Sequence, residues 1–195
     1  IERLLNYLKE MSEMLVYISE SINRTERNSI CVRVQELEKK VKEHSLKIIT
    51  GLDNNFLTEI SREDIVAIAK TAERISEKIM EACDTVDYFL EDFQGSKLMN
   101  QLCVPIRDSI SAIFICFKHI NKSASRLSAK DSSNKISHYN KFAEKSYQLI
   151  KAKVLTENTN QVYQIKLIEW LDRLNDITEQ CVEINYIFDL ILVKK

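Results

Sequence analysis

Apolar residues recur at spacings of three and four along most of the chain, most regularly between residues 167 and 192. The same spacings recur between residues 65 and 90, where every position is displaced by 102 residues. The two sets are Ile65, Ile68, Ala72, Ile75, Ile79, Ala82 and Val86, and Leu167, Trp170, Leu174, Ile177, Cys181, Ile184 and Phe188. Such spacing keeps one apolar stripe in register on a helix that packs beside nearly parallel or antiparallel helices. Each set therefore predicts the long closing helix of a bundle.

Similar stripes predict two more helices in the first half of the chain. They lie at about 2–22 and 28–52, and the first copy of the repeat then falls in a helix at about 61–93. Ser61 precedes this third helix, where its hydroxyl can accept a hydrogen bond from the backbone amide of Asp64. The first half thus contains three predicted helices.

The second half repeats this organisation. A helix with a bend at Pro105 is predicted at about 97–123. The polar stretch at 125–133 predicts a loop, in which Asp131 or Ser132 caps a fifth helix that ends near residue 154. The second copy of the repeat lies in a sixth helix, at about 161–193.

A shortage of turn-forming residues supports this fold class. The 195 residues include two glycines and one proline, whereas sandwiches, barrels and doubly wound sheets need many turns. We therefore expect an all-α protein of six long helices that form two repeated, antiparallel three-helix bundles. The first bundle covers residues 1–94, the second covers 95–195, and together they make a single domain.

Charge, cysteine content and hydropathy exclude several classes of protein. The formal net charge of −1 gives no field that favours nucleic acid. Five widely spaced cysteines without a C-x-x-C pair predict buried free thiols in a reducing cytosol. The most apolar run, 110–117, is far shorter than the roughly 20 residues that span a bilayer. We expect a cytoplasmic protein with no nucleic-acid partner and no direct membrane insertion.

The sequence lacks the common catalytic motifs. It contains no glycine-rich phosphate-binding loop of the Walker or dinucleotide type and no G-x-S-x-G. His44, His119 and His138 lie on different predicted helices, without a cysteine or carboxylate at metal-ligand spacing on the same helix. An isolated histidine without a nucleophile or an orienting group does not make a mechanism. We expect a protein that is not an enzyme.

Acidic side chains also recur at the offset of 102. In the heptad frame they lie outside the apolar stripe, on the exterior of the bundles. Carboxylates four residues apart repel one another unless a cation relieves them, and their oxygens suit Mg²⁺, Mn²⁺ or oxygen-bound iron. The positions are Glu73, Glu77 and Glu81, repeated as Asn175, Glu179 and Glu183, and Glu38 and Lys42, repeated as Asn140 and Glu144. A solvated helix face explains the same pattern, because 29% of the chain is charged.

Several segments carry a resemblance to a known family. NFLTEISREDI, at 55–65, lies between LEKKVKEHSLKII and TAERISEKI, and the chain ends in IEWLDRLNDITEQCVEINYIFDLILVKK. The first segment is similar to the T-F-I-T-P-[ILF]-D-R-E-D-I segment of the PhoU-related family of phosphate transport regulators, and the last resembles that family's final helix. These are small cytoplasmic proteins associated with Pit-type phosphate transporters. The resemblance covers almost the whole chain.

The resemblance implies two three-helix bundles, a regulatory role in phosphate uptake and, in some relatives, metal clusters on the outer face held by acidic-x-x-x-Asp motifs. Carried over by position, the metal ligands are Glu38, Glu73, Glu77, Asn140, Glu144, Asn175 and Glu179, and Lys42 stands where a carboxylate is expected. We hypothesise that the ammonium of Lys42 reaches toward Glu38, Glu73 or Glu77 and replaces a metal in the first half. The second half keeps two carboxylates and two amide oxygens, enough for one weakly held divalent metal or iron on the bundle exterior.

One primary hypothesis and two alternatives follow. From the resemblance, the chain is a non-enzymatic regulator of phosphate transport that acts by contact with a Pit-type transporter or a signalling partner, through which it reaches the membrane periphery. The first alternative is a metal-binding helical protein with surface carboxylate clusters. The second is a general helical scaffold that forms homo-oligomers through exposed apolar surface, most readily on the first helix.

Overall fold

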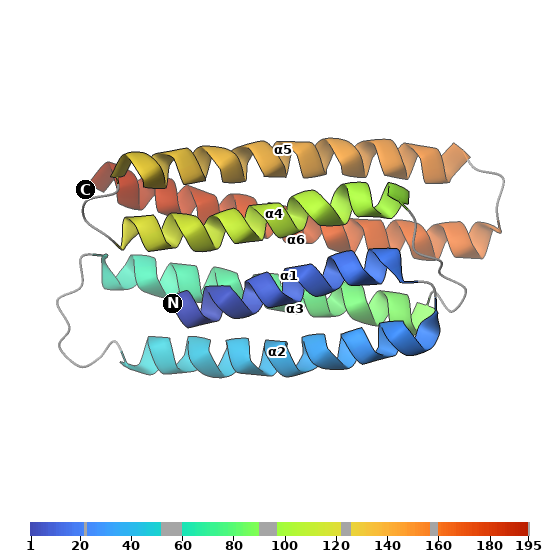
Figure 1. Cartoon of the computed structure of the whole chain (residues 1–195), viewed down its shortest axis with the longest axis horizontal. Helices are drawn as coiled ribbons and strands as arrows, with labels where there is room; N and C mark the ends of the chain where they lie inside the picture. The colour runs from blue at the N-terminus through green and yellow to red at the C-terminus, as the bar shows by residue number, and fades with distance from the viewer. Residues whose placement is uncertain (22, 52–59, 90–96, 122–125, 157–159, 195) are drawn as a thin grey trace.

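Long amphipathic helices form here because each apolar stripe is covered by neighbouring helices, which stabilises the helix beyond its intrinsic propensity. The computed structural model describes residues 1–21, 23–51, 60–89, 97–121, 126–156 and 160–194, and six helices fill most of these ranges (Figure 1). The first half holds α1 (Glu2–Glu20), α2 (Arg24–Gly51) and α3 (Arg62–Phe89). The second half holds α4 (Lys97–Ile120), α5 (Arg126–Thr156) and α6 (Gln161–Lys194).

The helices form two three-helix bundles that lie next to each other (Figure 1). Within each bundle every helix packs against the other two, and the chain reverses direction at each connection. The bundles join through two contacts, α1 against α4 and α3 against α6. Helices α2 and α5 lie on the outer sides, away from the junction (Figure 1). The predicted all-α fold of two three-helix bundles is confirmed.

The core follows the apolar repeat. All seven positions of the first set on α3 and all seven of the second set on α6 are buried, so the predicted stripes are confirmed. Trp170 and Phe188 are the bulkiest of these side chains, and the ring of Phe188 packs 6.4 Å from the ring of Phe117 on α4. Burying side chains of this size contributes about 2–3 kcal/mol each to the free energy of unfolding.

Helix boundaries agree with the prediction in some places and not in others. The backbone amide of Asp64 donates to the hydroxyl of Ser61 over 3.1 Å, so the predicted cap of α3 is confirmed. The second helix begins at Arg24 rather than near residue 28. Helix α4 runs without a break through Pro105. The predicted connection at 53–60, which contains the NFLTEI of the family-like segment, lies outside the described residues except for Ile60.

The loop predicted at 125–133 is wrong, because α5 already begins at Arg126. Ser132 donates to the backbone carbonyl of Ser128 over 2.8 Å, and Ser133 donates to Oδ1 of Asp189 on α6 over 2.6 Å. These bonds satisfy hydroxyls that usually favour turns. Neither Asp131 nor Ser132 caps the helix, since both lie within its second turn.

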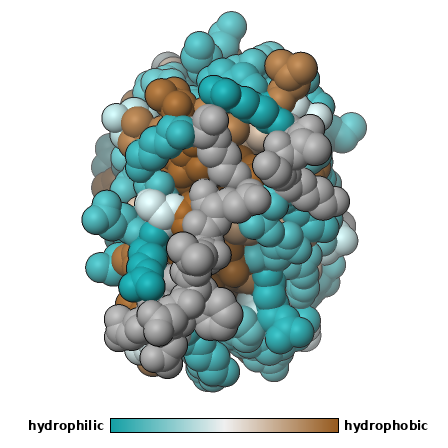
Figure 2. Space-filling view, turned by 90° about the vertical axis from the view of Figure 1, so that its left-hand side faces the viewer, coloured by the Kyte–Doolittle hydropathy of each residue, from teal (hydrophilic) through white to brown (hydrophobic). Residues whose placement is uncertain are grey.

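The remaining surface is largely polar. The end of the molecule in Figure 2 is mostly hydrophilic, and hydrophobic side chains show in smaller groups between polar ones. Within the described ranges, every helix is too short or too polar to span a bilayer. All five cysteines are free and buried, as predicted, and burial raises the pKa of Cys103, Cys116 and Cys181 to about 12.

Candidate functional site

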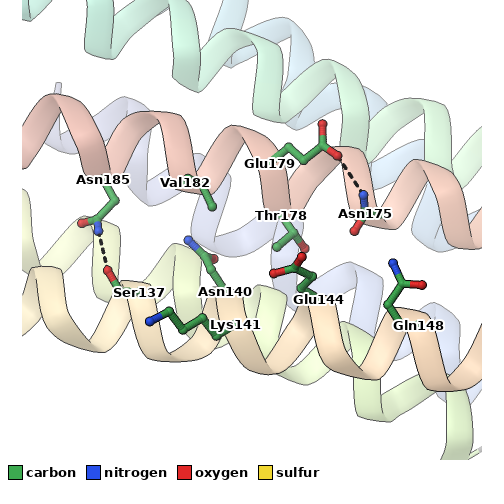
Figure 3. A pocket seen from close by; sticks show the side chains of 10 residues that line it. All are labelled: Ser137, Asn140, Lys141, Glu144, Gln148, Asn175, Thr178, Glu179, Val182 and Asn185. Carbon is green, nitrogen blue, oxygen red and sulfur yellow. Dashed lines mark hydrogen bonds between the residues drawn. The ribbon is translucent and has the colours of Figure 1, made fainter.

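The four candidate ligands of the second half line one cavity between α5 and α6. It has a volume of about 530 Å³, and every side chain that lines it except Val182 is polar or charged (Figure 3). The lining residues are Ser137, Asn140, Lys141, Glu144 and Gln148 on α5, and Asn175, Thr178, Glu179, Val182 and Asn185 on α6. The structure therefore brings together, from two separate helices, positions that the internal repeat had indicated.

Two carboxylates line this cavity, and Lys141 is the basic side chain that lines it with them. Glu179 accepts a hydrogen bond from Nδ2 of Asn175 over 2.9 Å. Across the described part of the chain, neither Glu144 nor Glu179 forms an ion pair with a basic side chain. Because the two side chains project from facing helices (Figure 3), a cation in the cavity would be attracted to both.

Asn140 differs from its predicted position on the exterior. Its side chain is 4% exposed, and its Oδ1 accepts a hydrogen bond from the hydroxyl of Ser109 on α4 over 2.7 Å. That bond satisfies a polar group that would otherwise be costly to bury. The carbonyl oxygen of Asn140 is thus already engaged in the core and is a weaker candidate for a metal ligand.

In the first half, Lys42 closes the equivalent site. Its ammonium nitrogen lies 2.7 Å from Oε1 of Glu38 and 3.5 Å from Oε1 of Glu77. The hydrogen bond to Glu38 raises the pKa of Lys42, which keeps the ammonium charged. Glu73 instead accepts a hydrogen bond from the hydroxyl of Ser45 over 2.8 Å. The predicted contacts of Lys42 with Glu38 and Glu77 are confirmed, and the third carboxylate has a partner of its own.

Two solved structures share this architecture from end to end. The crystal structure of a PhoU-like protein from Shewanella oneidensis MR-1 matches with a TM-score of 0.79 at 12% identity, over 100% of this chain and 98% of that one. The crystal structure of a candidate PhoU-like phosphate regulatory protein from the same organism matches with a TM-score of 0.78 at 12% identity, over 100% and 97%. This chain has a PhoU-like fold.

The PhoU-like fold is a likeness of shape, since so low an identity carries no residue roles from one protein to the other. No protein-family model and no curated protein matches the sequence.

The first half of this PhoU-like chain does not fit a metal. The ammonium of Lys42 lies between Glu38 and Glu77, where a bound cation would otherwise neutralise them. The second half offers the carboxylates of Glu144 and Glu179, with amide groups beside them. Within the described ranges, no three His, Cys, Asp or Glu side chains come together as a metal-binding group. The donor set fits one weakly held hard cation at most.

The last members of the acidic series bind the two bundles of the PhoU-like fold together. A guanidinium nitrogen of Arg173 lies 2.9 Å from Oε2 of Glu81, and one of Arg74 lies 3.0 Å from Oε1 of Glu183. Sequence reasoning missed both ion pairs, because the partners are 92 and 109 residues apart. No local spacing rule reports a contact between helices so distant in the chain.

Proposed function

We propose that this protein is a non-enzymatic regulator of inorganic phosphate transport, which acts in the cytoplasm by contact with a Pit-type phosphate transporter or a related signalling partner. The observation that carries the proposal is the PhoU-like fold over the whole chain. The segment NFLTEISREDI and the final helix resemble the PhoU-related family and support the proposal from the sequence side. In this role the transporter brings the protein to the membrane.

The arrangement of the reactive groups favours a role through contact. Nδ1 of His44 lies 2.9 Å from the backbone carbonyl of Lys40, one turn earlier on α2, and the ring of His138 packs against Tyr139 on α5. The thiols of Cys103 and Cys181 are buried, and a pKa of about 12 keeps them protonated near neutral pH. Nδ1 of His119 lies 3.2 Å from the hydroxyl of Ser132, but that hydroxyl donates its proton to the backbone carbonyl of Ser128 over 2.8 Å rather than to the ring. A catalytic role would need a nucleophile that is activated by a base.

Co-purification tests the proposal. The tagged full-length chain is expressed in its own cells under phosphate-replete and phosphate-starved conditions, captured from mild detergent extracts, and analysed by mass spectrometry. The expected result is enrichment of a phosphate permease or a phosphate-responsive signalling protein over a control that carries only the tag. If both conditions recover neither kind of partner, the proposed function is wrong.

Cation binding in the cavity between α5 and α6 is a second candidate function. It is favoured by one observation: Glu144 and Glu179 line the same cavity from two neighbouring helices and form no ion pair with any described basic side chain. Elemental analysis of protein purified without chelator or metal-affinity steps should find up to one divalent ion per chain, lost in Glu144→Gln and Glu179→Gln but kept in the exposed control Glu43→Gln. Trace metal in the unaltered protein would remove this candidate.

A further inference from the structure

A groove of about 840 Å³ lies along α3 and α6, where the two bundles join. Half-buried and buried apolar side chains line it, including Val66 and Ala67 from α3 and Ile187 from α6. An apolar stripe continues on α6 and remains open to solvent, with Tyr186 63% exposed and Leu190 39% exposed. The stripe consists of Val182, Tyr186, Leu190 and Val193, whose spacing places them on one face of the helix. A continuous exposed apolar face of this kind is a candidate binding surface.

The α3 wall of this groove carries basic charge. Arg74 forms an ion pair with Glu183 on the opposite wall over 3.0 Å, so these two charges neutralise each other. Arg62 and Lys70 line the same wall and have no acidic partner among the described residues. Glu63 also lines the groove, in the first turn of α3, and its negative charge offsets one of these two positive charges. The groove therefore offers open positive charge beside an apolar floor.

The shape of the groove suits a third helix. The stretch of α3 that lines it, from Arg62 to Arg74, rises by about 18 Å, which a partner helix of about 12 residues matches. A helix laid in such a groove buries residues at i, i+3, i+4 and i+7 and leaves its flanks at the rim. Acidic flanks would meet Arg62 and Lys70. A second copy of this chain is a poorer fit, because its α6 is already packed against α3, α4 and α5 and cannot enter as a free helix.

We propose that the groove between α3 and α6 binds an acidic amphipathic helix of a partner protein. The proposal rests on the proposed function, because the transporter or signalling partner supplies that helix. Apolar contact with the α6 stripe provides most of the affinity, and the basic wall selects the charge of the flanks.

Two labelled peptides test this chemistry on the full-length chain by fluorescence anisotropy. Both have 16 residues and the same leucine stripe at helical spacing, and they differ only in having glutamates or lysines on the flanks. The glutamate peptide should bind about tenfold more tightly at low salt, and the difference should shrink at high salt. The double variant Arg62→Glu, Lys70→Glu should reverse the preference, since both side chains are exposed and free to change sign.

Variants in the apolar stripe locate the binding surface. Tyr186→Glu and Leu190→Glu should each weaken binding of the glutamate peptide by about tenfold or more. The matched control is Leu149→Glu on α5, a 63% exposed leucine outside the groove, which should leave binding unchanged. Circular dichroism and the thermal midpoint establish that each variant is folded.

Several outcomes would overturn the groove proposal. They are failure of both peptides to bind, equal binding of the two, or an equal loss of binding in Leu149→Glu. A dimer in light scattering that Tyr186→Glu converts to a monomer would show that a second copy occupies the groove instead. The proposed function fails separately from the groove proposal. If the peptide binds but no phosphate-related partner is recovered, the proposed function is wrong and the groove proposal stands. If Tyr186→Glu recovers the partner as well as the unaltered protein does, the groove proposal is wrong and the proposed function stands.

Discussion

Lys42 and Glu144 stand at equivalent positions in the two halves and carry opposite charges. The lysine lies between two carboxylates of its own half, at 2.7 and 3.5 Å, and offsets one of their two negative charges. The glutamate faces a polar cavity and adds a second negative charge to that of Glu179. The charge at this position, together with the asparagines that stand in place of Glu38 and Glu73 in the second half, distinguishes the two sites.

Changing Lys42 to aspartate should open the first-half site. Lys42→Asp removes the ammonium and places a third carboxylate beside Glu38 and Glu77. A bound cation would relieve the repulsion among these three carboxylates. We expect the variant to gain a divalent metal such as Mn²⁺ in elemental analysis and to be less stable without it by about 1 kcal/mol. The matched control is Lys39→Asp, an exposed lysine on the same helix. A Lys42→Asp protein that binds no more metal than this control would contradict the role of Lys42.

Asp64 makes the stability of the protein depend on pH in the acidic range. Burial of its side chain favours the neutral form, but hydrogen bonds with Ser61 and Lys194 outweigh this and lower the pKa of Asp64 below its ordinary value of 3.8. Because the pKa is lowered on folding, the carboxylate stabilises the fold at any pH above its ordinary pKa. This stabilisation is lost as the pH falls through the lower pKa of the folded state. Asp64→Asn should therefore destabilise the protein by roughly 1 kcal/mol at neutral pH and by much less in strong acid. Urea unfolding at about pH 7 and pH 2.5 checks this, and a pH-independent difference would contradict it.

The closing helices α3 and α6 show what a sequence pattern can determine at the scale of an element. Their stripes were predictable because a spacing of three and four is a property of the helix itself and needs no knowledge of its neighbours. The start of α5 was not predictable in this way. By residue type Ser133 favours a loop, but in the folded protein its hydroxyl donates a hydrogen bond to Asp189, 56 residues later in the chain. Local propensity favours a turn there, and a contact in the folded structure overrides it.

Equivalent positions of the two stripes should cost similar amounts when truncated. Ile75 and Ile177 are both fully buried and stand 102 residues apart. Ile75→Ala and Ile177→Ala should each lower the free energy of unfolding by about 2–5 kcal/mol, because each leaves a cavity in a packed bundle. The exposed Val182→Ala should change it by less than about 0.5 kcal/mol. Chemical denaturation measures all three, and a tolerated alanine at either buried position would show that the two stripes are not equivalent.

At the scale of the whole molecule, the contacts at the junction between the bundles were the least predictable from the sequence. The pattern predicted two bundles, the resemblance implied seven candidate ligands by position, and the structure places four of these ligands around one cavity. The sequence pattern could not predict that Glu81 pairs with Arg173 and that Glu183 pairs with Arg74. In each ion pair the arginine belongs to the other bundle. The alternative of an oligomerising scaffold needed leftover apolar surface, for which the first helix was the first candidate although Leu8 and Met11 belong to its core stripe; the exposed stripe lies on α6. Which helix faces remain open depends on how the bundles dock.

Uptake of labelled inorganic phosphate tests the regulatory role most directly. The initial rate is measured in cells that lack the chain and in the same cells carrying it on a plasmid, each after growth in high and in low phosphate. A regulator of phosphate transport predicts that loss of the chain changes the rate or its response to phosphate supply, and that the plasmid restores both. Identical rates with and without the chain under both conditions would contradict the proposed function.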